Sequence, residues 1–93
     1  MSAKAVRVRI TGRVQGVFFR AWAKEKAEAF GVQGWIRNRL DGDVEALFIG
    51  EAAAVDRLLA ACREGPPTAQ VDEVKTEPAQ GLAPAGFEIK PTV

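Results

Sequence analysis

The hydrophobic periodicity of the chain changes around a short glycine-containing segment near its N-terminus. Apolar and basic residues alternate over 6–10, the period-2 pattern of a β-strand with one buried face. Over 19–30, apolar residues recur every three or four positions, as on one face of an α-helix. The strand positions are Val6, Val8 and Ile10, and the helix positions are Phe19, Ala23, Ala27 and Phe30. Segment 12–20 must therefore turn a strand into a helix, and Gly31 suits the C-cap of that helix.

A hairpin and a second helix are predicted in the middle of the chain. Segments 35–39 and 44–49 flank Asp41-Gly42, a dipeptide typical of hairpin turns. A second apolar stripe at helical spacing follows over 55–62, and Gly65-Pro66-Pro67 ends that helix.

The last third of the chain predicts two further strands. The first covers 69–77, and Val71 and Val74 differ in parity there, which indicates a β-bulge. A loop over 78–86 leads to a short strand over 87–89.

The element order βαββαβ with a short fifth strand predicts an α+β fold of the ferredoxin-like type. In this plan two helices cover one face of a mainly antiparallel sheet. Because 93 residues suffice for one domain and are too few for two, we expect residues 1–93 to form a single domain.

The side chains present exclude several kinds of chemistry. The chain has no histidine, so Ser-His-Asp catalysis, phosphohistidine intermediates and histidine-ligated metals are excluded. Cys62 lies on the second apolar stripe and is expected to be buried, and Thr68 stands where a cysteine phosphatase loop needs arginine. Asp41-Gly42-Asp43 is interpreted as a turn and not as a metal-binding pair. Neither a metal nor another cofactor is expected.

Charge is distributed unevenly along the chain. Residues 1–40 hold nine Lys/Arg and two Asp/Glu (+7), whereas residues 41–93 hold four and ten (−6), which sums to +1. An anionic partner is therefore expected to bind the first half, unless basic and acidic strands interleave and cancel. The single cysteine, the lack of an 18-residue apolar run and the absence of a signal-like N-terminal segment lead us to expect a cytoplasmic protein without membrane contact.

Segment 12–20 has the features of an oxyanion-binding turn. Glycines at 12 and 16 permit a tight turn, and the free N–H groups at the start of the following helix favour an anion. Arg20 adds a guanidinium whose planar fork matches two phosphate oxygens. The spacing is neither a Walker A motif nor a dinucleotide fingerprint. The plainer alternative is a tight turn followed by a solvated arginine.

Three segments together resemble the acylphosphatase family: Gly-Arg-Val-Gln-Gly-Val-Phe-Phe-Arg at 12–20, Gly-Trp-Ile-Arg-Asn at 34–38 and Asp-Gly-Asp-Val-Glu at 41–45. The resemblance covers nearly the whole chain and extends to 65–67 and 86–89. It implies a monomeric, metal-independent enzyme that hydrolyses acyl phosphates, with a small-molecule substrate and with phosphate or sulfate as product or mimic. No cofactor, nucleic acid or membrane is implied.

The resemblance also assigns roles to residues. Arg20 is expected to bind the substrate phosphate, and Asn38 to orient the attacking water. The backbone amides expected to line the phosphate cradle are those of Gln15, Gly16, Val17, Phe18 and Phe19. This sequence departs from the family at Ala23, where threonine is frequent, and at Arg39, where a small or neutral polar residue is usual.

Two functions of other classes remain as alternatives. An RNA-binding module could use a ferredoxin-like sheet, but the first strand offers no aromatic side chain for base stacking. A non-catalytic anion-binding or regulatory domain is the second, including the acylphosphatase-like piece of a larger carbamoyl-transferring maturation protein. Because the chain is short and has no zinc-finger cysteines, we expect it to be self-contained and not a piece of such a larger protein.

Overall fold

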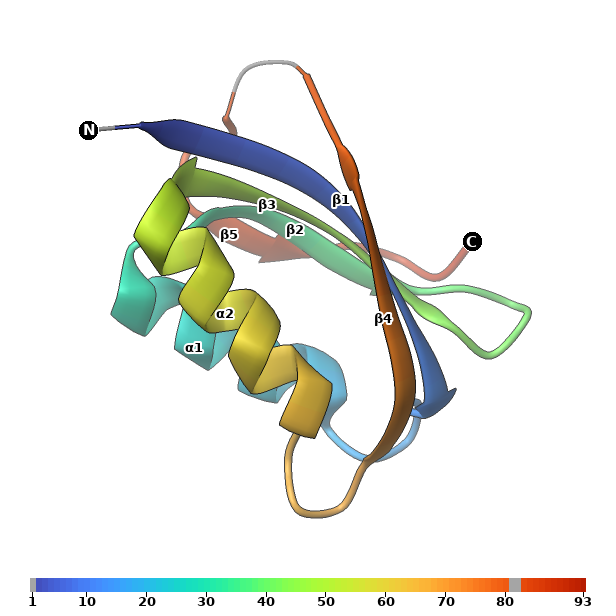
Figure 1. Cartoon of the computed structure of the whole chain (residues 1–93). Coiled ribbons are helices and arrows are strands. Elements are labelled where there is room, and N and C mark those ends of the chain that lie inside the picture. Colours follow the sequence, from blue (N-terminus) through green and yellow to red (C-terminus); the bar gives the residue numbers. More distant parts are fainter. Residues whose placement is uncertain (1, 81–82) are drawn as a thin grey trace.

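A mixed sheet with both helices on one face makes up the computed structural model, which describes residues 2–80 and 83–93 (Figure 1). The elements are β1 (Ala3–Arg13), α1 (Phe19–Phe30), β2 (Gln33–Asn38), β3 (Val44–Glu51), α2 (Ala52–Glu64), β4 (Gln70–Pro78) and β5 (Phe87–Ile89). Residues 81 and 82 of the loop predicted over 78–86 lie outside the described residues. No helix of the described part is long and apolar enough to cross a membrane.

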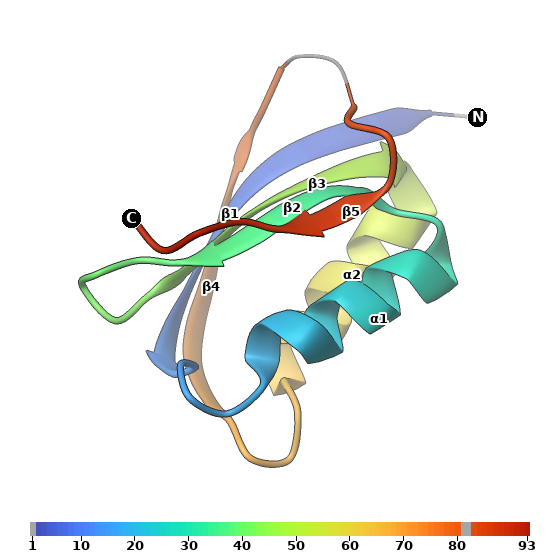
Figure 2. The same cartoon turned by 180° about the vertical axis from the view of Figure 1, so that it is seen from behind.

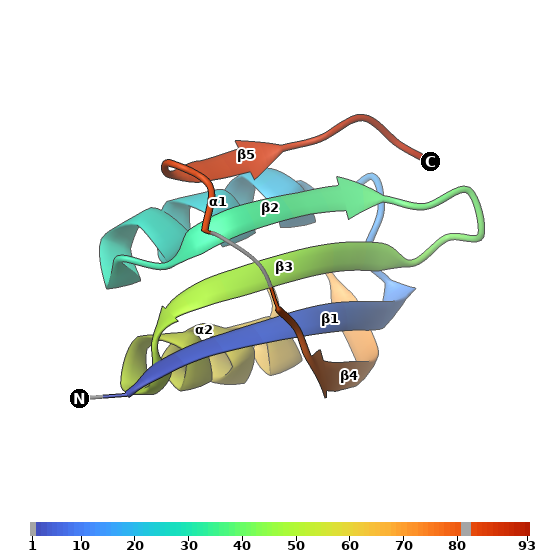
Figure 3. The same ribbon diagram turned by 90° about the horizontal axis from the view of Figure 1, so that it is seen from above.

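The strands run in the order β4-β1-β3-β2-β5, as the view from above shows (Figure 3). Neighbouring strands are antiparallel except β2 and β5, which are parallel. The predicted hairpin is confirmed by the register that pairs Trp35 with Leu47 and Asn38 with Val44. Two helices on one face of this sheet confirm the predicted ferredoxin-like α+β fold (Figure 2).

The hydrophobic core lies between the helices and the inner face of the sheet. Both predicted helical stripes are buried there, and Gly31 caps α1 in the left-handed conformation, as predicted. The core members from β1 and the helices are Val6, Val8, Ile10, Phe19, Ala23, Ala27, Val55, Leu58, Leu59 and Cys62. Burial raises the pKa of the Cys62 thiol to about 12, so this side chain is inert packing, as expected.

The boundary between β1 and the following loop differs from the prediction. Gly12 and Arg13 belong to β1, where they pair with Val71 and Gln70 of β4. The pairing of β1 with β4 shifts in register between Thr11 and Gly12. The shift places an extra residue on β4, which confirms the predicted bulge there. Gly12 has φ 120°, and a Cβ there would lie 2.3 Å from the Gln70 carbonyl oxygen. Gly12 therefore shapes the bulge, and the loop begins only after Arg13.

Acidic residues of the β2–β3 turn pair with an arginine on the outer face of β1. Arg9 Nε donates to Asp43 Oδ2 at 2.8 Å, and Arg9 Nη2 pairs with Asp41. The backbone N–H of Asp43 donates to Asp41 Oδ1 at 3.0 Å and, together with Arg9 and Arg39, lowers the pKa of Asp41. The Asp41-Gly42-Asp43 segment is thus a turn, as predicted, and its carboxylates are engaged within the sheet.

Glu45 of β3 is the buried charged residue of the outer face, with 7% of its surface exposed. Burial alone would raise its pKa, but Arg37 at 2.8 Å and Arg39 at 3.2 Å outweigh that effect and lower it. Arg39, a departure from the family pattern, is therefore held by an ion pair on the outer face. These pairs show that basic and acidic strands do interleave, and much of the positive charge of the first half is neutralised in the sheet.

The lowered pKa of Glu45 predicts a pH-dependent contribution to stability. This contribution should be fully present above the unfolded-state pKa of about 4.3 and should disappear as pH falls through the lower folded-state value. The destabilisation caused by Glu45→Gln should therefore be larger at pH 7 than at pH 3, as measured by urea unfolding. Glu25→Gln, at an exposed position of α1, is the control and should show no such difference. An equal effect of Glu45→Gln at both pH values would contradict this account.

Candidate functional site

The loop between β1 and α1 is anchored by apolar side chains. Val14 and Val17 are 1% and 5% exposed and belong to the core, as does Phe19 at the start of α1. Gly16 and Phe18, which alternate with them, face solvent. Burial of the alternate side chains fixes the path of the backbone between them, so the peptide groups of the loop are held at the surface in one arrangement.

The backbone of this loop turns through the left-handed region twice. Gly16 has φ 73°, which glycine adopts without strain, and Phe18, the N-cap residue of α1, has φ 61°. No side chain caps this helix within the described residues, and its first turn contains no acidic residue. The Trp22 N–H makes the first helical hydrogen bond, to the Phe18 carbonyl at 3.0 Å. The preceding amides thus retain the positive potential of a helix N-terminus.

Two polar side chains brace the loop against other parts of the fold. Gln15 Nε2 donates to the carbonyl oxygens of Arg39 at 2.7 Å and of Asp43 at 2.9 Å, both in the β2–β3 turn. On the other side, the Thr68 hydroxyl donates to the Val17 carbonyl at 2.9 Å. The sequence predicts a role only for the backbone amide of Gln15. The partners of its side chain lie 24 and 28 residues away, and no local pattern could indicate them.

A cavity of about 270 Å³ opens where the loop meets α1. It is lined by Gly16, Phe18, Phe19, Arg20, Ala21 and Ile89. The fold thus brings four of the predicted phosphate-site residues to one surface, whereas Gln15 and Val17 do not line it. Ala21 and Ile89 were not predicted. Ile89 comes from β5, which lies beside α1 (Figure 2) and is tied to it by the Lys24 ammonium, 2.8 Å from the Phe87 carbonyl oxygen.

Asn38 ends β2 and does not line this cavity. It follows Ile36 by two positions, so its side chain lies on the helix-covered face on which Ile36 is buried, as predicted. Its Oδ1 is buried and has no hydrogen-bond partner among the described residues. The Gln15 side chain donates a hydrogen bond to the carbonyl oxygen of Arg39, which follows Asn38 in the chain. This bond holds the loop at a fixed distance from the end of β2. A buried amide oxygen without a partner is expected to bind a donor such as water.

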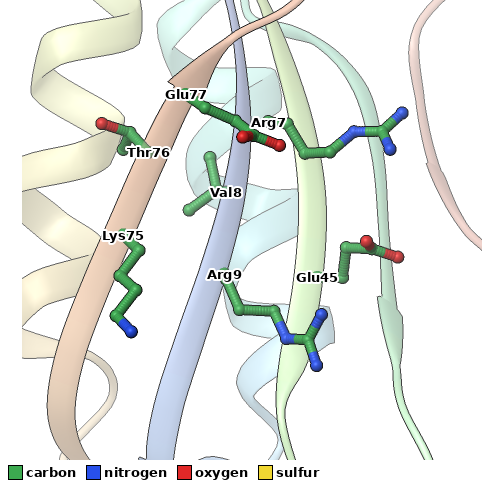
Figure 4. Close-up of a pocket in the computed structure, with 7 residues that line it drawn as sticks. All are labelled: Arg7, Val8, Arg9, Glu45, Lys75, Thr76 and Glu77. Atoms are coloured by element: carbon green, nitrogen blue, oxygen red, sulfur yellow. The ribbon is translucent and has the colours of Figure 1, made fainter.

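A larger cavity of about 330 Å³ lies on the outer face of the sheet, between β1 and β4 (Figure 4). It is lined by Arg7, Val8, Arg9, Glu45, Lys75, Thr76 and Glu77. Positive and negative side chains alternate around it, and Arg9 is already paired with two carboxylates. This surface is therefore a poor anion site. Arg20, in contrast, makes no ion pair in the described part of the chain and keeps its charge available.

Metal-ligating side chains do not gather at the loop. Within residues 2–80 and 83–93, no group of three or more His, Cys, Asp or Glu residues is placed to hold a metal ion. What the site offers is backbone amides, one guanidinium and one amide side chain. Such groups suit a tetrahedral oxyanion.

Comparison with known proteins gives one consistent result. The sequence model of the acylphosphatase family matches residues 6–89. An acylphosphatase of Rhodospirillum rubrum is 50% identical over 90 residues, which cover 97% of this chain and 99% of that protein. An acylphosphatase of Rubrobacter xylanophilus is 58% identical over 89 residues, covering 94% of this chain and 80% of that protein.

The fold comparison agrees with the sequence comparison. The structure of an acylphosphatase from Coxiella burnetii superimposes with a TM-score of 0.90 and 35% sequence identity. The match covers 95% of this chain and 93% of that one.

The side-chain brace of Gln15 predicts a measurable loss when it is removed. Gln15→Ala should lower the free energy of unfolding by about 1–3 kcal/mol, because two hydrogen bonds worth roughly 0.5–1.5 kcal/mol each are lost. It should also weaken the binding of inorganic phosphate, since the loop is no longer tied to the β2–β3 turn. Urea unfolding and calorimetric titration measure the two effects.

The matched control is Gln33→Ala, at an exposed position of β2. It should leave phosphate binding unchanged. If Gln15→Ala behaved like this control in both measurements, the brace would have no role in shaping the site.

Proposed function

The chain belongs to the acylphosphatase family and hydrolyses acyl phosphates to a carboxylate and inorganic phosphate, and we propose that Arg20, the loop amides and Asn38 carry out this reaction. The observation that carries the proposal is the cavity at the start of α1. It combines the loop backbone with a guanidinium that makes no ion pair with any carboxylate that the structure describes.

The substrate phosphate binds to the backbone N–H groups of residues 15–19 and to Arg20. A phosphoryl group in transfer spreads negative charge over three equatorial oxygens. Several donors fixed in space stabilise this charge without reorganising during the reaction, and the guanidinium adds two parallel N–H donors. The burial of Val14 and Val17 supports this role, because it holds the donors in place before the substrate arrives.

Asn38 orients the attacking water. Its buried Oδ1 accepts a hydrogen bond from the water, whose oxygen attacks phosphorus as the P–O bond to the acyl group breaks. The bonding electron pair leaves with the carboxylate, and the water proton passes to a phosphate oxygen or to solvent. Asn38 is neutral and has no basic atom, so it positions the water and does not deprotonate it.

The reaction needs no acid group to assist departure. An acyl phosphate is a mixed anhydride, and its leaving group is a carboxylate, which is stable as an anion. This explains how a chain without histidine can catalyse the hydrolysis. It also supports catalysis without a metal, because the fixed donors and Arg20 supply the positive potential.

We also propose that residues 1–93 form one domain that acts as a cytoplasmic monomer without a nucleic-acid partner. In support of a single domain, the loop, its braces and the lining of the cavity come from segments as far apart in the sequence as Gly16 and Ile89. The central strands β1 and β3 offer no outward aromatic side chain for base stacking. Trp35 of β2 is covered by the Arg37 guanidinium and the Lys90 ammonium at 4.7 and 5.0 Å from its ring.

Arg20→Ala and Asn38→Ala should each lower kcat/KM for benzoyl phosphate by about 10²-fold or more, the usual cost of losing one preorganised donor. Arg20→Lys should recover only part of the loss, because an ammonium cannot make the bidentate contact. Phosphate release measured with EDTA present should equal that without EDTA. Circular dichroism should show that all three variants are folded.

Arg7→Ala is the matched control, because this exposed arginine lies on the opposite face of the sheet and should be dispensable for turnover. The mechanism would be wrong if Arg20→Ala and Asn38→Ala were as active as the Arg7→Ala protein, or if EDTA abolished turnover.

A further inference from the structure

Two exposed apolar side chains stand at the same cavity as Arg20. Phe18 is 82% exposed and Ile89 is 42% exposed, and both line the cavity at the start of α1. Among the described residues, the other large apolar side chains with comparable exposure are Leu40 and Val93, which do not line it. An exposed apolar surface beside a charged binding group is typical of ligand sites.

The conformation of Phe18 gives a second, independent indication. Phe18 is the one non-glycine residue with positive φ among residues 2–80 and 83–93. A bulky side chain is unfavourable in this region, and glycine or asparagine would fit it better. Its neighbours Val17 and Phe19 are buried, so the backbone turn directs the Phe18 ring outward, where it contributes little to the core. Strain of this kind concentrates at ligand-binding sites.

We propose that Phe18 and Ile89 form an apolar wall that binds the acyl group of the substrate. The proposal rests on the function proposed above, in which the phosphate occupies the loop. The acyl carbon is linked to that phosphate through one oxygen, so the acyl group must lie against the remaining walls of the same cavity. The large exposed apolar side chains among those walls are Phe18 from the loop and Ile89 from β5.

The composition of the walls defines the substrate class. Arg20 is the charged side chain among the lining residues, and its charge is used by the phosphate. A carboxylate or an ammonium on the acyl group would lose its hydrating water on binding without gaining an oppositely charged side chain as a partner. An aromatic or branched aliphatic acyl group would instead bury apolar surface against the wall. The preferred substrates are therefore acyl phosphates with uncharged, bulky apolar acyl groups.

The test compares kcat/KM for benzoyl phosphate with kcat/KM for acetyl phosphate. Taking the ratio within each protein cancels changes in phosphate binding, including any that Phe18→Asn causes through the loop backbone. Phe18→Asn and Ile89→Thr should each lower the benzoyl-to-acetyl ratio by about three- to tenfold, the effect of several tens of Å² of lost apolar contact. Leu40→Thr, an exposed apolar residue away from the cavity, is the matched control and should keep the wild-type ratio.

Inhibition by inorganic phosphate distinguishes the contribution of the wall from that of the phosphate cradle. The inhibition constant of inorganic phosphate should be raised strongly by Arg20→Lys and by less than about twofold by Ile89→Thr, since phosphate has no acyl group to contact the wall. An unchanged ratio in both wall variants, with turnover still dependent on Arg20, would overturn the wall and leave the proposed function intact. Wild-type protein that hydrolysed neither substrate would overturn both.

Discussion

Burial of alternate side chains in the loop between β1 and α1 is the constraint on which the site depends. Val14 and Val17 are part of the core, so the peptide groups between them cannot move without exposing apolar surface. Gln15 and Thr68 then tie the loop to the β2–β3 turn and to the segment before β4. The same packing that stabilises the fold therefore also preorganises the donors, and no separate scaffold is needed for them.

The charges of the sheet complement this arrangement. Arg9, Arg37 and Arg39 are paired with carboxylates on the outer face, although the sequence places them in the strongly basic first half. These three arginines are thus engaged, whereas Arg20 makes no ion pair among residues 2–80 and 83–93. Three of the nine basic residues in the first 40 positions are therefore engaged on the outer face, and the site proposed above relies on Arg20 for anion binding and not on a broad basic patch.

The sequence predicted most of the fold because its signals are local. Each of these signals depends on residues that are close in sequence. They are the hydrophobic periodicity, the Asp41-Gly42 turn and the parity change between Val71 and Val74. The sequence predicts Gly12 in the loop, whereas it belongs to β1, because its strand pairing depends on β4, nearly 60 residues further along the chain. The motif predicts the cradle residues, four of which line the cavity, but the Gln15 brace and the proposed Ile89 wall depend on contacts between distant elements. Periodicity and motif spacing contain no information about such contacts.

The chemistry of the site explains which substrates it can serve. Backbone amides and a guanidinium stabilise charge on a phosphoryl group but cannot donate a proton to a poor leaving group or remove one from water. A site of this kind is limited to phosphates whose leaving group departs as a stable anion. Within that limit, the phosphate contacts are common to all substrates and cannot distinguish among them. Discrimination must come from surfaces that touch the acyl group, and the outward ring of Phe18 facing the same cavity as Ile89 provides such a surface. The strained backbone at Phe18 fits this proposal, because the position that closes the proposed phosphate cradle is also the one from which a side chain would reach the acyl group.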